Sequence, residues 1–377
     1  MSFFFLLLIG AIYLLYFVIL LKYFFAWKEV RSSITADVAH QPFISVIVPV
    51  RNEEKSIITL LEFISRQTLH PDRFEIIIVN DHSDDHTMNK VYLYIKEHPE
   101  ANIVPTSLSV SSSKKMAVTA GISLAKGELI VTTDADCWMN VGWLEELAAY
   151  YVKYHPVMII APVMLKNPES FLQRFQQLDY LAMQTAGLAA ASSGHPVLCS
   201  GANLAFTKQA FLEVGGYEGN EAISSGDDVF LMFKLKQHFP GRIHSFVNRN
   251  VIVYSSPIES AREFIRQRHR WGGKVRHYQN RYVAVLGAII MLTNLCLLLV
   301  AAGIYFRYAS PFFLLMLFLF KTIIDFLFIK KSASFFSVEL KLWDILRMEL
   351  FYPFYFLWLI LYELGGENEW KGRKMKG

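Results

Sequence analysis

The stretch Leu129-Ile130-Val131-Thr132-Thr133-Asp134-Ala135-Asp136 decides the fold class of this chain. Its first five residues are aliphatic or β-branched, which is typical of a buried strand. Two carboxylates, Asp134 and Asp136, follow at once with one small residue between them. Ligands in open α/β sheets bind beyond the carboxyl ends of the strands. The stretch therefore predicts a strand that delivers two acidic side chains to a ligand site.

Strand-like and helix-like segments alternate on both sides of this stretch. Strands are predicted over residues 43–48, 74–80, 128–133 and 157–161, and helices over residues 56–66, 114–125 and 141–154. That order is typical of βαβ units. We therefore expect an α/β domain with a mostly parallel mixed sheet over residues 40–255.

The composition indicates a membrane protein. Of the 377 residues, 53% are hydrophobic and 19% are charged, and the mean hydropathy is +0.31, whereas about a quarter of the residues of a soluble domain are charged. The net charge of +4 comes without an arginine-rich tract interleaved with aromatics, which argues against a nucleic-acid partner. The three cysteines have no CxxC spacing, so a disulfide framework or zinc site is not expected.

An apolar run at the start of the chain predicts a transmembrane anchor over residues 1–30. The run covers residues 3–27, is interrupted by Lys22, and is long enough to cross a hydrocarbon core of about 30 Å. A cleaved signal peptide is the alternative, but no basic residue precedes the run and no Ala-x-Ala site follows it. Lys22, Lys28 and Arg31 on its carboxyl side predict an integral cell (inner) membrane protein whose following domain is cytoplasmic.

A second membrane region is expected over residues 283–365. Residues 283–306 and 311–329 predict two spans, and Lys321 and Asp325 within the second have the i,i+4 spacing of a self-neutralising pair. Either a functional or an interhelical role fits that pair. The third stretch, 350–364, is short and holds Pro353. If it crosses the bilayer, the basic tail 366–377 lies outside, against the positive-inside rule. Re-entry of the third stretch and an interfacial helix over residues 340–350 therefore both stay open.

Further acidic residues stand where a ligand site needs them. Asp81 follows the predicted strand 74–80 and is placed to accept a hydrogen bond from a uracil base or a ribose hydroxyl, while Asp84 and Asp85 fit a turn. Asp227 and Asp228 open an apolar helical run. One carboxylate there fits a helix cap. Two adjacent carboxylates exceed what capping needs. A carboxylate within hydrogen-bond reach of an acceptor hydroxyl can take the proton of that hydroxyl during a displacement.

A basic helix is predicted within the QxxRW region, residues 256–282. Ser256-Pro257-Ile258-Glu259 has the form of a capping box, and Gly272-Gly273 is the expected end of the helix. Offsets of three and four place Gln267, Arg270 and Trp271 on one face. Arg270 suits a phosphate group and Trp271 suits stacking on an acceptor. The helix equally fits anionic lipid headgroups, and both roles are compatible.

Taken in order, these motifs resemble those of membrane-bound family 2 glycosyltransferases, whose nucleotide-sugar domain has the GT-A fold. The resemblance covers residues 42–271. It is carried by Val48-Pro49-Val50-Arg51-Asn52-Glu53, Asn80-Asp81, Lys115 with Ala117 and Gly121, Thr133-Asp134-Ala135-Asp136, Gly201-Ala202-Asn203, Gly226-Asp227-Asp228 and Gln267-Arg268-His269-Arg270-Trp271. The family's usual Asp-Asp pair begins with Asn80 here, which leaves recognition of the base to Asp81.

The resemblance assigns roles to individual residues. It implies that Asp81 contacts the nucleotide base, that Asp134 contacts the ribose or diphosphate, and that Asp136 holds a divalent metal, Mg²⁺ or Mn²⁺, with Asp134. Asp228 matches the general base, with Asp227 beside it. Further candidates are Asn52, Glu53 and Lys115 for donor binding, and Gln267, Arg270 and Trp271, the QxxRW motif, for the diphosphate and the acceptor.

The resemblance also implies an activity. We expect an inverting, metal-dependent transfer of a sugar from a nucleotide-sugar, a UDP-sugar by preference, to a lipid acceptor at the cytoplasmic membrane face, as in glycolipid synthases of the ceramide glucosyltransferase type. A processive polysaccharide synthase of the same family is the alternative, although few C-terminal spans make a thin polymer channel. A non-catalytic nucleotide-sugar-binding membrane protein is a remoter one, because all four key carboxylates are present.

Overall fold

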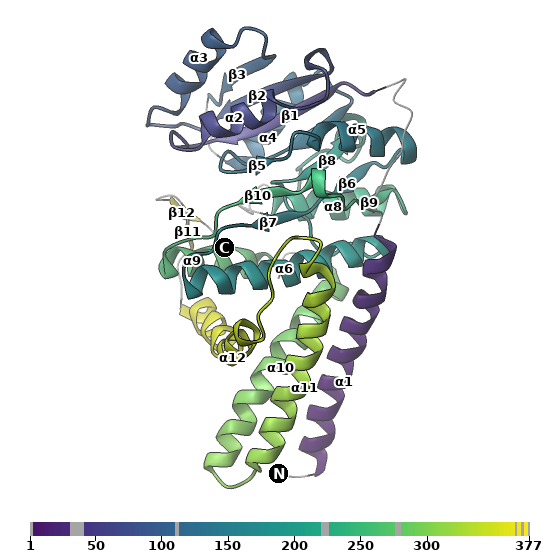
Figure 1. The fold of residues 1–377 in the computed structure, drawn as a ribbon, viewed down its shortest axis with the longest axis vertical. Coiled ribbons are helices and arrows are strands. Elements are labelled where there is room, and N and C mark those ends of the chain that lie inside the picture. The colour runs from purple at the N-terminus through teal and green to yellow at the C-terminus, as the bar shows by residue number, and fades with distance from the viewer. Residues whose placement is uncertain are drawn as a thin grey trace. The chain divides into compact units, whose positions relative to one another are not determined.

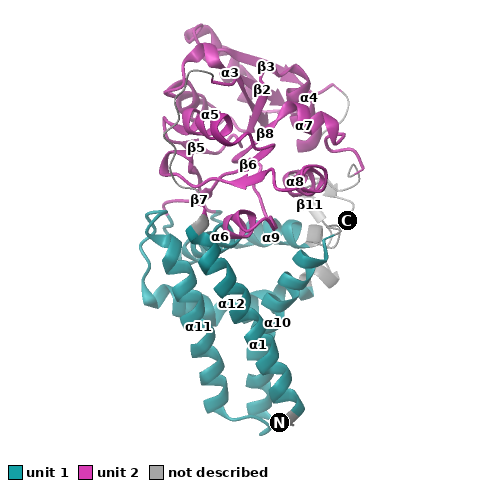
Figure 2. Cartoon of the chain, turned by 90° about the vertical axis from the view of Figure 1, so that its right-hand side faces the viewer, with its two compact units in different colours: residues 1–28, 168–186, 258–377 teal, residues 29–167, 187–257 magenta. Residues whose placement is uncertain are grey.

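The computed structural model describes residues 3–30, 41–109, 113–219, 226–275, 280–365, 368–370 and 373–375. The chain divides into two compact units, coloured separately in Figure 2. Unit 1 comprises residues 1–28, 168–186 and 258–377, and unit 2 comprises residues 29–167 and 187–257.

Unit 2 is built around a seven-stranded sheet in the order β3-β2-β1-β4-β8-β6-β9. Four neighbours, β3, β2, β1 and β4, are parallel, while β8 is antiparallel to both β4 and β6. The predicted α/β class with a mostly parallel mixed sheet is thus confirmed. The strands are β1 (Ile44–Val50), β2 (Phe74–Asn80), β3 (Ile103–Ser107), β4 (Leu129–Thr132), β6 (Met158–Ile160), β8 (Leu204–Thr207) and β9 (Ile243–Ser245).

The central strands are buried on both faces because helices cover the sheet (Figure 1). The helices of unit 2 are α2 (Ile57–Ser65), α3 (Thr87–Glu97), α4 (Lys114–Leu124), α5 (Trp143–Tyr154), α7 (Lys208–Glu213) and α8 (Asp227–His238). Helix α4 packs directly on β1 and β2. Gly121 permits this approach, since a Cβ there would stand 2.7 Å from Ile47 Cγ2. Every strand and helix predicted above in this region is confirmed.

A smaller sheet of three short strands, in the order β5-β10-β7, completes unit 2. Its strands are β5 (Trp138–Met139), β7 (Val163–Leu165) and β10 (Val253–Ser255). Because β5 begins two residues after Asp136, this sheet borders the acidic stretch. Ser255 Oγ on β10 donates to Asp136 Oδ2 at 3.4 Å.

Among the described residues of unit 1, three helices are long and apolar enough to span a membrane. They are α1 (Phe3–Ala26), α10 (Arg281–Tyr305) and α11 (Pro311–Ala333), which confirms the expected helices at both ends of the chain. Tyr13 Oη donates to Thr293 O at 3.3 Å, and the hydroxyls of Tyr23 and Tyr282 lie 2.9 Å apart. Helices α1 and α10 are therefore antiparallel neighbours.

The remaining elements of unit 1 are the first part of α6 (Phe171–Ser192), then α9 (Ala261–Val275), α12 (Leu342–Gly365), and the short hairpin of β11 (Asn368–Trp370) and β12 (Arg373–Met375). The third C-terminal stretch is one continuous helix, α12, with Pro353 inside it. Asp344, Arg347 and Glu349 lie in its first turns, and α12 is not among the three candidate spans.

The predicted bounds of the basic helix are wrong at both ends. Helix α9 begins at Ala261, not at the Ser256-Pro257 capping box. The Gln176 side chain explains this, because it accepts from Ile258 N at 2.9 Å and donates to Ile258 O at 2.7 Å, which occupies backbone groups that a helix would use. The helix also continues through Gly272-Gly273 to Val275, since an interior glycine costs only about 1 kcal/mol relative to alanine.

Candidate active site

Asp134 and Asp136 stand at the carboxyl end of β4, on the turn that leads to β5. Thr133 N donates to Ile47 O at 3.3 Å and Cys137 N donates to Asp134 O at 3.2 Å, so the backbone on both sides of the carboxylates is fixed. Asp134 is partly exposed and Asp136 is exposed. A central strand thus presents two neighbouring carboxylates at an open edge, as the sequence predicts.

Lys114 is the cation that neutralises Asp134. It is the first residue of α4, and its Nζ forms an ion pair with Asp134 Oδ1. Ser113 caps that helix by accepting from Met116 N at 3.2 Å. Burial disfavours the charged lysine, but the nearby carboxylates of Asp134, Asp228 and Asp227 raise the pKa of Lys114 above its usual value. Lys114 therefore stays charged among acidic residues from two other elements.

Asp228 is held by backbone amides. Its Oδ2 accepts from Gly201 N at 2.9 Å and its Oδ1 accepts from Val229 N at 2.8 Å. Gly201 is itself tied to β4, because Thr132 Oγ1 donates to Gly201 O at 2.7 Å. A Cβ at Gly201 would lie 3.8 Å from Asp228 Oδ2 and 3.9 Å from Lys114 Nζ. Asp228, Lys114 and the end of β4 therefore meet around this glycine.

Asp227 has a different environment from its neighbour. Its side chain is buried, and its Oδ1 lies 3.4 Å from Nζ of Lys115, which is also buried. Lys115, a predicted donor-binding residue, thus faces Asp227 in α8, while the preceding residue, Lys114, faces Asp134. Asp227 is thus engaged by a buried cation, whereas Asp228 is oriented by backbone amides and is partly open to solvent.

Negative charge gathers at Asp136. Although Asp136 reaches solvent, the surrounding protein partly desolvates its carboxylate, and this desolvation together with the charges of Asp134 and Glu53 raises the pKa of Asp136. Among the described residues, no group of three or more His, Cys, Asp and Glu side chains is arranged to hold a metal. Asp134 and Asp136 are two neighbouring carboxylates, and Mg²⁺ uses one or two carboxylates when phosphate oxygens complete its shell. The residues fit such a metal, since a bound cation would relieve the repulsion at Asp136.

Asp81 lies at the end of β2, buried to 3% exposure. Arg51 Nη1 is 4.0 Å from Asp81 Oδ1, and His82 Nδ1 is 3.2 Å from the same oxygen. Asp81 N donates to Val50 O at 2.8 Å. The carboxylate is therefore fixed between the loops that follow β1 and β2.

The two loops beside Asp81 are joined by side-chain caps. Asp84 N donates to Asn52 Oδ1 at 3.0 Å, and Asn52 N donates to Ser83 Oγ at 3.1 Å. Glu53 N donates to Thr87 Oγ1 at 2.8 Å, while its carboxylate accepts from Ser56 Oγ at 2.9 Å. The Asn52 side-chain oxygen is thus engaged in loop structure, and the Glu53 carboxylate lies close enough to Asp136 to raise the pKa of Asp136.

Gln267, Arg270 and Trp271 lie on α9 in unit 1, whereas the carboxylates above lie in unit 2. Arg270 is half-buried, and burial together with the neighbouring Arg266 lowers its pKa. Within the part of the chain that the structure describes, no carboxylate forms an ion pair with Arg270. Trp271 lies 6.2 Å from Tyr180 between ring centroids. The helix thus carries a cation that an anion would stabilise.

Comparison with known proteins identifies the domain. Residues 45–215 match the model of Glycosyl transferase family 2. The chain therefore carries a family 2 glycosyltransferase domain. In structure, the chain is similar to the mannosyltransferase PcManGT from Pyrobaculum calidifontis, solved with GDP-Man and Mn²⁺, with a TM-score of 0.61 at 16% sequence identity over 95% of this chain and 96% of that one. This likeness confirms the GT-A fold.

Curated relatives of the family 2 domain differ in what they glycosylate. Polypeptide N-acetylgalactosaminyltransferase 3 of Drosophila melanogaster is 26% identical over 220 residues, 52% of this chain and 32% of that protein. Undecaprenyl-phosphate 4-deoxy-4-formamido-L-arabinose transferase of Pseudomonas fluorescens is 34% identical over 97 residues, 25% of this chain and 28% of that protein. The chain thus spans about a third or less of the length of these relatives.

The sequence alone identifies neither the role of Lys114 at the site nor the structural role of Asn203 next to the Gly201 loop. The sequence does not distinguish Lys114 from Lys115, because two adjacent lysines offer the same charge and only the helix start at Ser113 decides which one meets Asp134. Asn203 is the last residue of the Gly201-Ala202-Asn203 motif. It is fully buried, donates to Pro162 O and Val251 O at 2.7 Å each, and accepts from Trp143 Nε1 at 3.0 Å. An Asn after a Gly-Ala pair was the available signal.

Proposed function

We propose that this protein is an inverting, metal-dependent glycosyltransferase that moves a sugar from a UDP-sugar to a lipid acceptor at the cytoplasmic face of the cell (inner) membrane. One observation carries the proposal: Asp134, Lys114 and Asp228 converge around Gly201 at the end of β4. Lys114 and Asp134 are suited to bind the diphosphate of the donor as it leaves. Asp228, fixed by backbone amides beside them, is suited to take the proton of the acceptor hydroxyl.

The acceptor hydroxyl reacts in a single displacement. Its oxygen forms the bond to the anomeric carbon, its proton passes to Asp228, and the bond from the anomeric carbon to the diphosphate oxygen breaks to release UDP. This step inverts the anomeric centre and needs no enzymic nucleophile. Asp228 is preferred to Asp227 as the base because Lys115 pairs with Asp227, while amide donors orient Asp228 and leave it partly exposed.

The donor is bound by residues from several strand ends. Asp81 accepts from the base, Asn52 and Glu53 shape and charge the neighbouring loop, and Lys115 holds Asp227. Asp136 with Asp134 would hold Mg²⁺ or Mn²⁺, which when bound supplies positive charge to the leaving diphosphate. Lys114 supplies a second cation on the same side. Gln267, Arg270 and Trp271 are proposed to serve the diphosphate and the acceptor, as the QxxRW motif implies.

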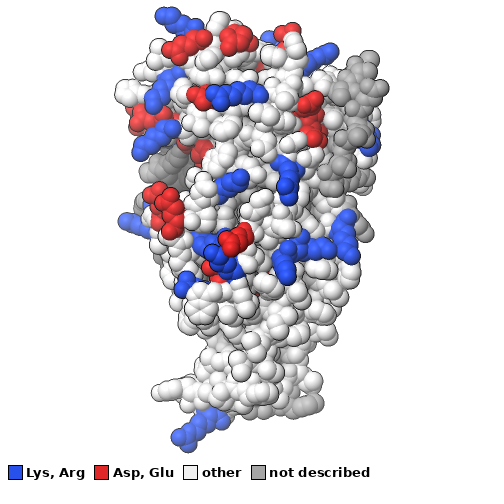
Figure 3. Space-filling model, viewed as in Figure 1, with Lys and Arg blue, Asp and Glu red and all other residues white. Residues whose placement is uncertain are grey.

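The apolar helices and the basic residues at their ends favour a lipid acceptor and a cytoplasmic location of the glycosyltransferase domain. Figure 3 shows a face on which part of the helix bundle carries almost no charged side chains. Lys28, Arg281, Lys330 and Lys331 lie at the ends of α1, α10 and α11 where the chain leaves and rejoins the bundle. Arg307 lies in the connection between α10 and α11. The positive-inside rule assigns the more basic end to the cytoplasm.

We propose the following domain organisation. Residues 1–30 form the anchor, 40–255 the glycosyltransferase domain, 256–282 the QxxRW region at the membrane surface, 283–365 the C-terminal membrane region, and 366–377 a basic tail. In that tail, residues 366–367, 371–372 and 376–377 lie outside the described residues.

A product assay tests the proposed function. Purified protein in lipid nanodiscs is incubated with Mn²⁺, a UDP-sugar panel and total lipid extract of the expression host. Mass spectrometry should detect a lipid heavier by one sugar residue, made from one or a few of the UDP-sugars. Products carrying long sugar chains would favour a polysaccharide synthase instead, and nucleotide binding without any product would favour a non-catalytic protein.

A further inference from the structure

Two arginines of the QxxRW segment have opposite environments. Arg270 is half-buried, whereas Arg268 is buried to 5% exposure. Arg268 Nη2 lies 2.6 Å from Asp179 Oδ2, on α6. The carboxylate outweighs the effect of burial and raises the pKa of Arg268. Arg268 is therefore a fixed internal cation, unlike the arginine that the motif itself names.

The guanidinium of Arg268 lies against two aromatic rings of its own helix. Its Cζ is 4.6 Å from the ring centroid of Trp271 and 5.0 Å from that of Phe264. Offsets of three and four residues place all three side chains on one helical face. A desolvated Arg over a Trp face is attracted by about 2 kcal/mol. The orientation of the Trp271 indole thus depends on where Arg268 is held.

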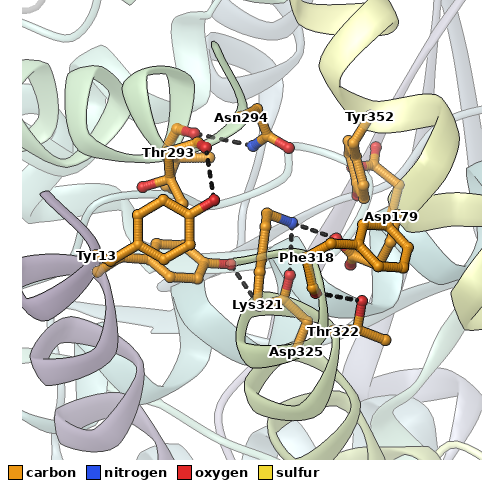
Figure 4. A network of polar contacts seen from close by, with 12 residues as sticks. Tyr13, Asp179, Thr293, Asn294, Phe318, Lys321, Thr322, Asp325 and Tyr352 are labelled. Atoms are coloured by element: carbon orange, nitrogen blue, oxygen red, sulfur yellow. Dashed lines mark hydrogen bonds and ion pairs between the residues drawn. The ribbon is translucent and has the colours of Figure 1, made fainter. Parts of the chain in front are cut away.

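Asp179 is held in turn by a third helix. Tyr352 Oη on α12 donates to Asp179 Oδ1 at 2.6 Å, so both carboxylate oxygens of Asp179 are engaged. Figure 4 shows Asp179 and Tyr352 side by side, next to Lys321. One turn earlier on α6, Gln176 binds the backbone of Ile258 just ahead of α9. Helix α6 therefore fixes α9 at its start and again at Arg268.

This arrangement is better suited to orientation than to stability. Replacing a buried ion pair by apolar residues of similar volume is often neutral or stabilising, so holding α9 in place does not require Asp179 and Arg268. What apolar residues lack is a guanidinium that pairs with a carboxylate by charge and at the same time lies over an indole ring.

We propose that Asp179 and Arg268 are positioning residues that set the orientation of Trp271 for the acceptor. That Trp271 contacts the acceptor rests on the proposed function. That Arg268 holds the Trp271 indole is argued from the structure. Tyr352 supports the same chain of contacts, Tyr352 to Asp179 to Arg268 to Trp271. These contacts connect the QxxRW helix, α9, to α12, and α12 packs on the membrane helices α10 and α11.

Two mild variants test the proposal in full-length protein in nanodiscs. Arg268→Lys keeps the charge for Asp179 but loses the planar contact with Trp271, and Tyr352→Phe removes only the hydroxyl that holds Asp179. Arg347→Lys is the matched control, because Arg347 is exposed and lies 5.1 Å over Trp343 in the same unit. The protein is labelled with 5-fluorotryptophan, and Trp271→Phe identifies the Trp271 fluorine resonance among seven tryptophans.

The expected result separates positioning from a merely structural role. Arg268→Lys should shift the Trp271 resonance and lower kcat for transfer to lipid about tenfold, with KM for the UDP-sugar changed less than about twofold. Tyr352→Phe should change both in the same direction by less, and Arg347→Lys should change neither. The inference is overturned if the Trp271 resonance and kcat stay at wild-type values in both variants. If wild-type protein shows no transfer, the proposed function fails, while the resonance still reports how Trp271 is held.

Discussion

Lys114 at the start of α4 forms an ion pair with Asp134 at the end of β4, so the acidic turn is already partly neutralised by a lysine that borders Asp228. The consequence concerns the donor. Removing this cation would leave Asp134, Asp136 and Asp228 to repel a diphosphate.

Lys114→Gln is therefore expected to weaken donor use. We expect KM for the UDP-sugar to rise about tenfold or more, since one cation facing a phosphate contributes about 1.5–3 kcal/mol. UDP release at varied donor concentration measures it. Lys126→Gln is the control, because the Lys126 side chain is 72% exposed. An unchanged KM in Lys114→Gln would remove this lysine from the donor site.

Chelation tests the proposed metal. EDTA should stop UDP release, and Mn²⁺ or Mg²⁺ should restore it. Asp136→Asn should raise the Mn²⁺ concentration needed for half-maximal turnover about tenfold, because it removes a carboxylate ligand. Asp84→Asn, at an exposed position on the loop after β2, should leave that concentration unchanged. Full turnover in EDTA would contradict the metal proposal.

A buried charge cluster in the membrane bundle predicts a large stability effect. Lys321 Nζ lies 2.7 Å from Asp325 Oδ2 and also pairs with Glu349, while Tyr16 Oη donates to Asp325 (Figure 4). Lys321→Met leaves both carboxylates buried without their cation, which costs about 3–5 kcal/mol. Thermal unfolding in detergent should show a strongly lowered midpoint.

Two further variants sharpen the prediction for that cluster. Glu349→Gln should lower the unfolding midpoint much less, because Lys321 keeps Asp325 as its partner. Lys330→Met, at an exposed position on the same helix, should leave the midpoint near that of wild type. Equal midpoints for Lys321→Met and Lys330→Met would show that the cluster contributes little to stability.

Cysteine labelling tests the proposed orientation. The three native cysteines are buried, so background labelling should be low. Tyr308→Cys lies between α10 and α11, and Glu339→Cys lies between α11 and α12, both at exposed positions. A membrane-impermeant maleimide added to intact cells should label position 308 at once and position 339 only after permeabilisation. The reverse pattern would place the active site outside the cell.

The sequence predicted the sheet and the acidic strand ends well because both depend on local pattern. The run before Asp134 is β-branched and the strands are separated by amphipathic helices. The sequence therefore predicts both the α/β fold class and the edge of the sheet at which the carboxylates lie. The i,i+4 pair of Lys321 and Asp325 was visible for the same reason. Its third member, Glu349, comes from another helix and was not.

The features that could not be predicted from the sequence depend on contacts between distant segments. Helix α9 starts late because Gln176, far earlier in the chain, binds Ile258. The role of Arg268 depends on Asp179 in the same way. The choice between Lys114 and Lys115 depends on helix phase at a single capping serine. None of these contacts leaves a periodic signal in the chain.

The most direct test of the account compares UDP release by wild-type protein and Asp228→Asn, with Asp72→Asn as a control whose side chain is 90% exposed. Both are assayed in nanodiscs with Mn²⁺, the active UDP-sugar and acceptor lipid. Loss of a general base should lower kcat at least about a hundredfold, with KM for the donor and the unfolding midpoint close to wild type. Turnover in Asp228→Asn within twofold of wild type would contradict the proposed transfer reaction at this site.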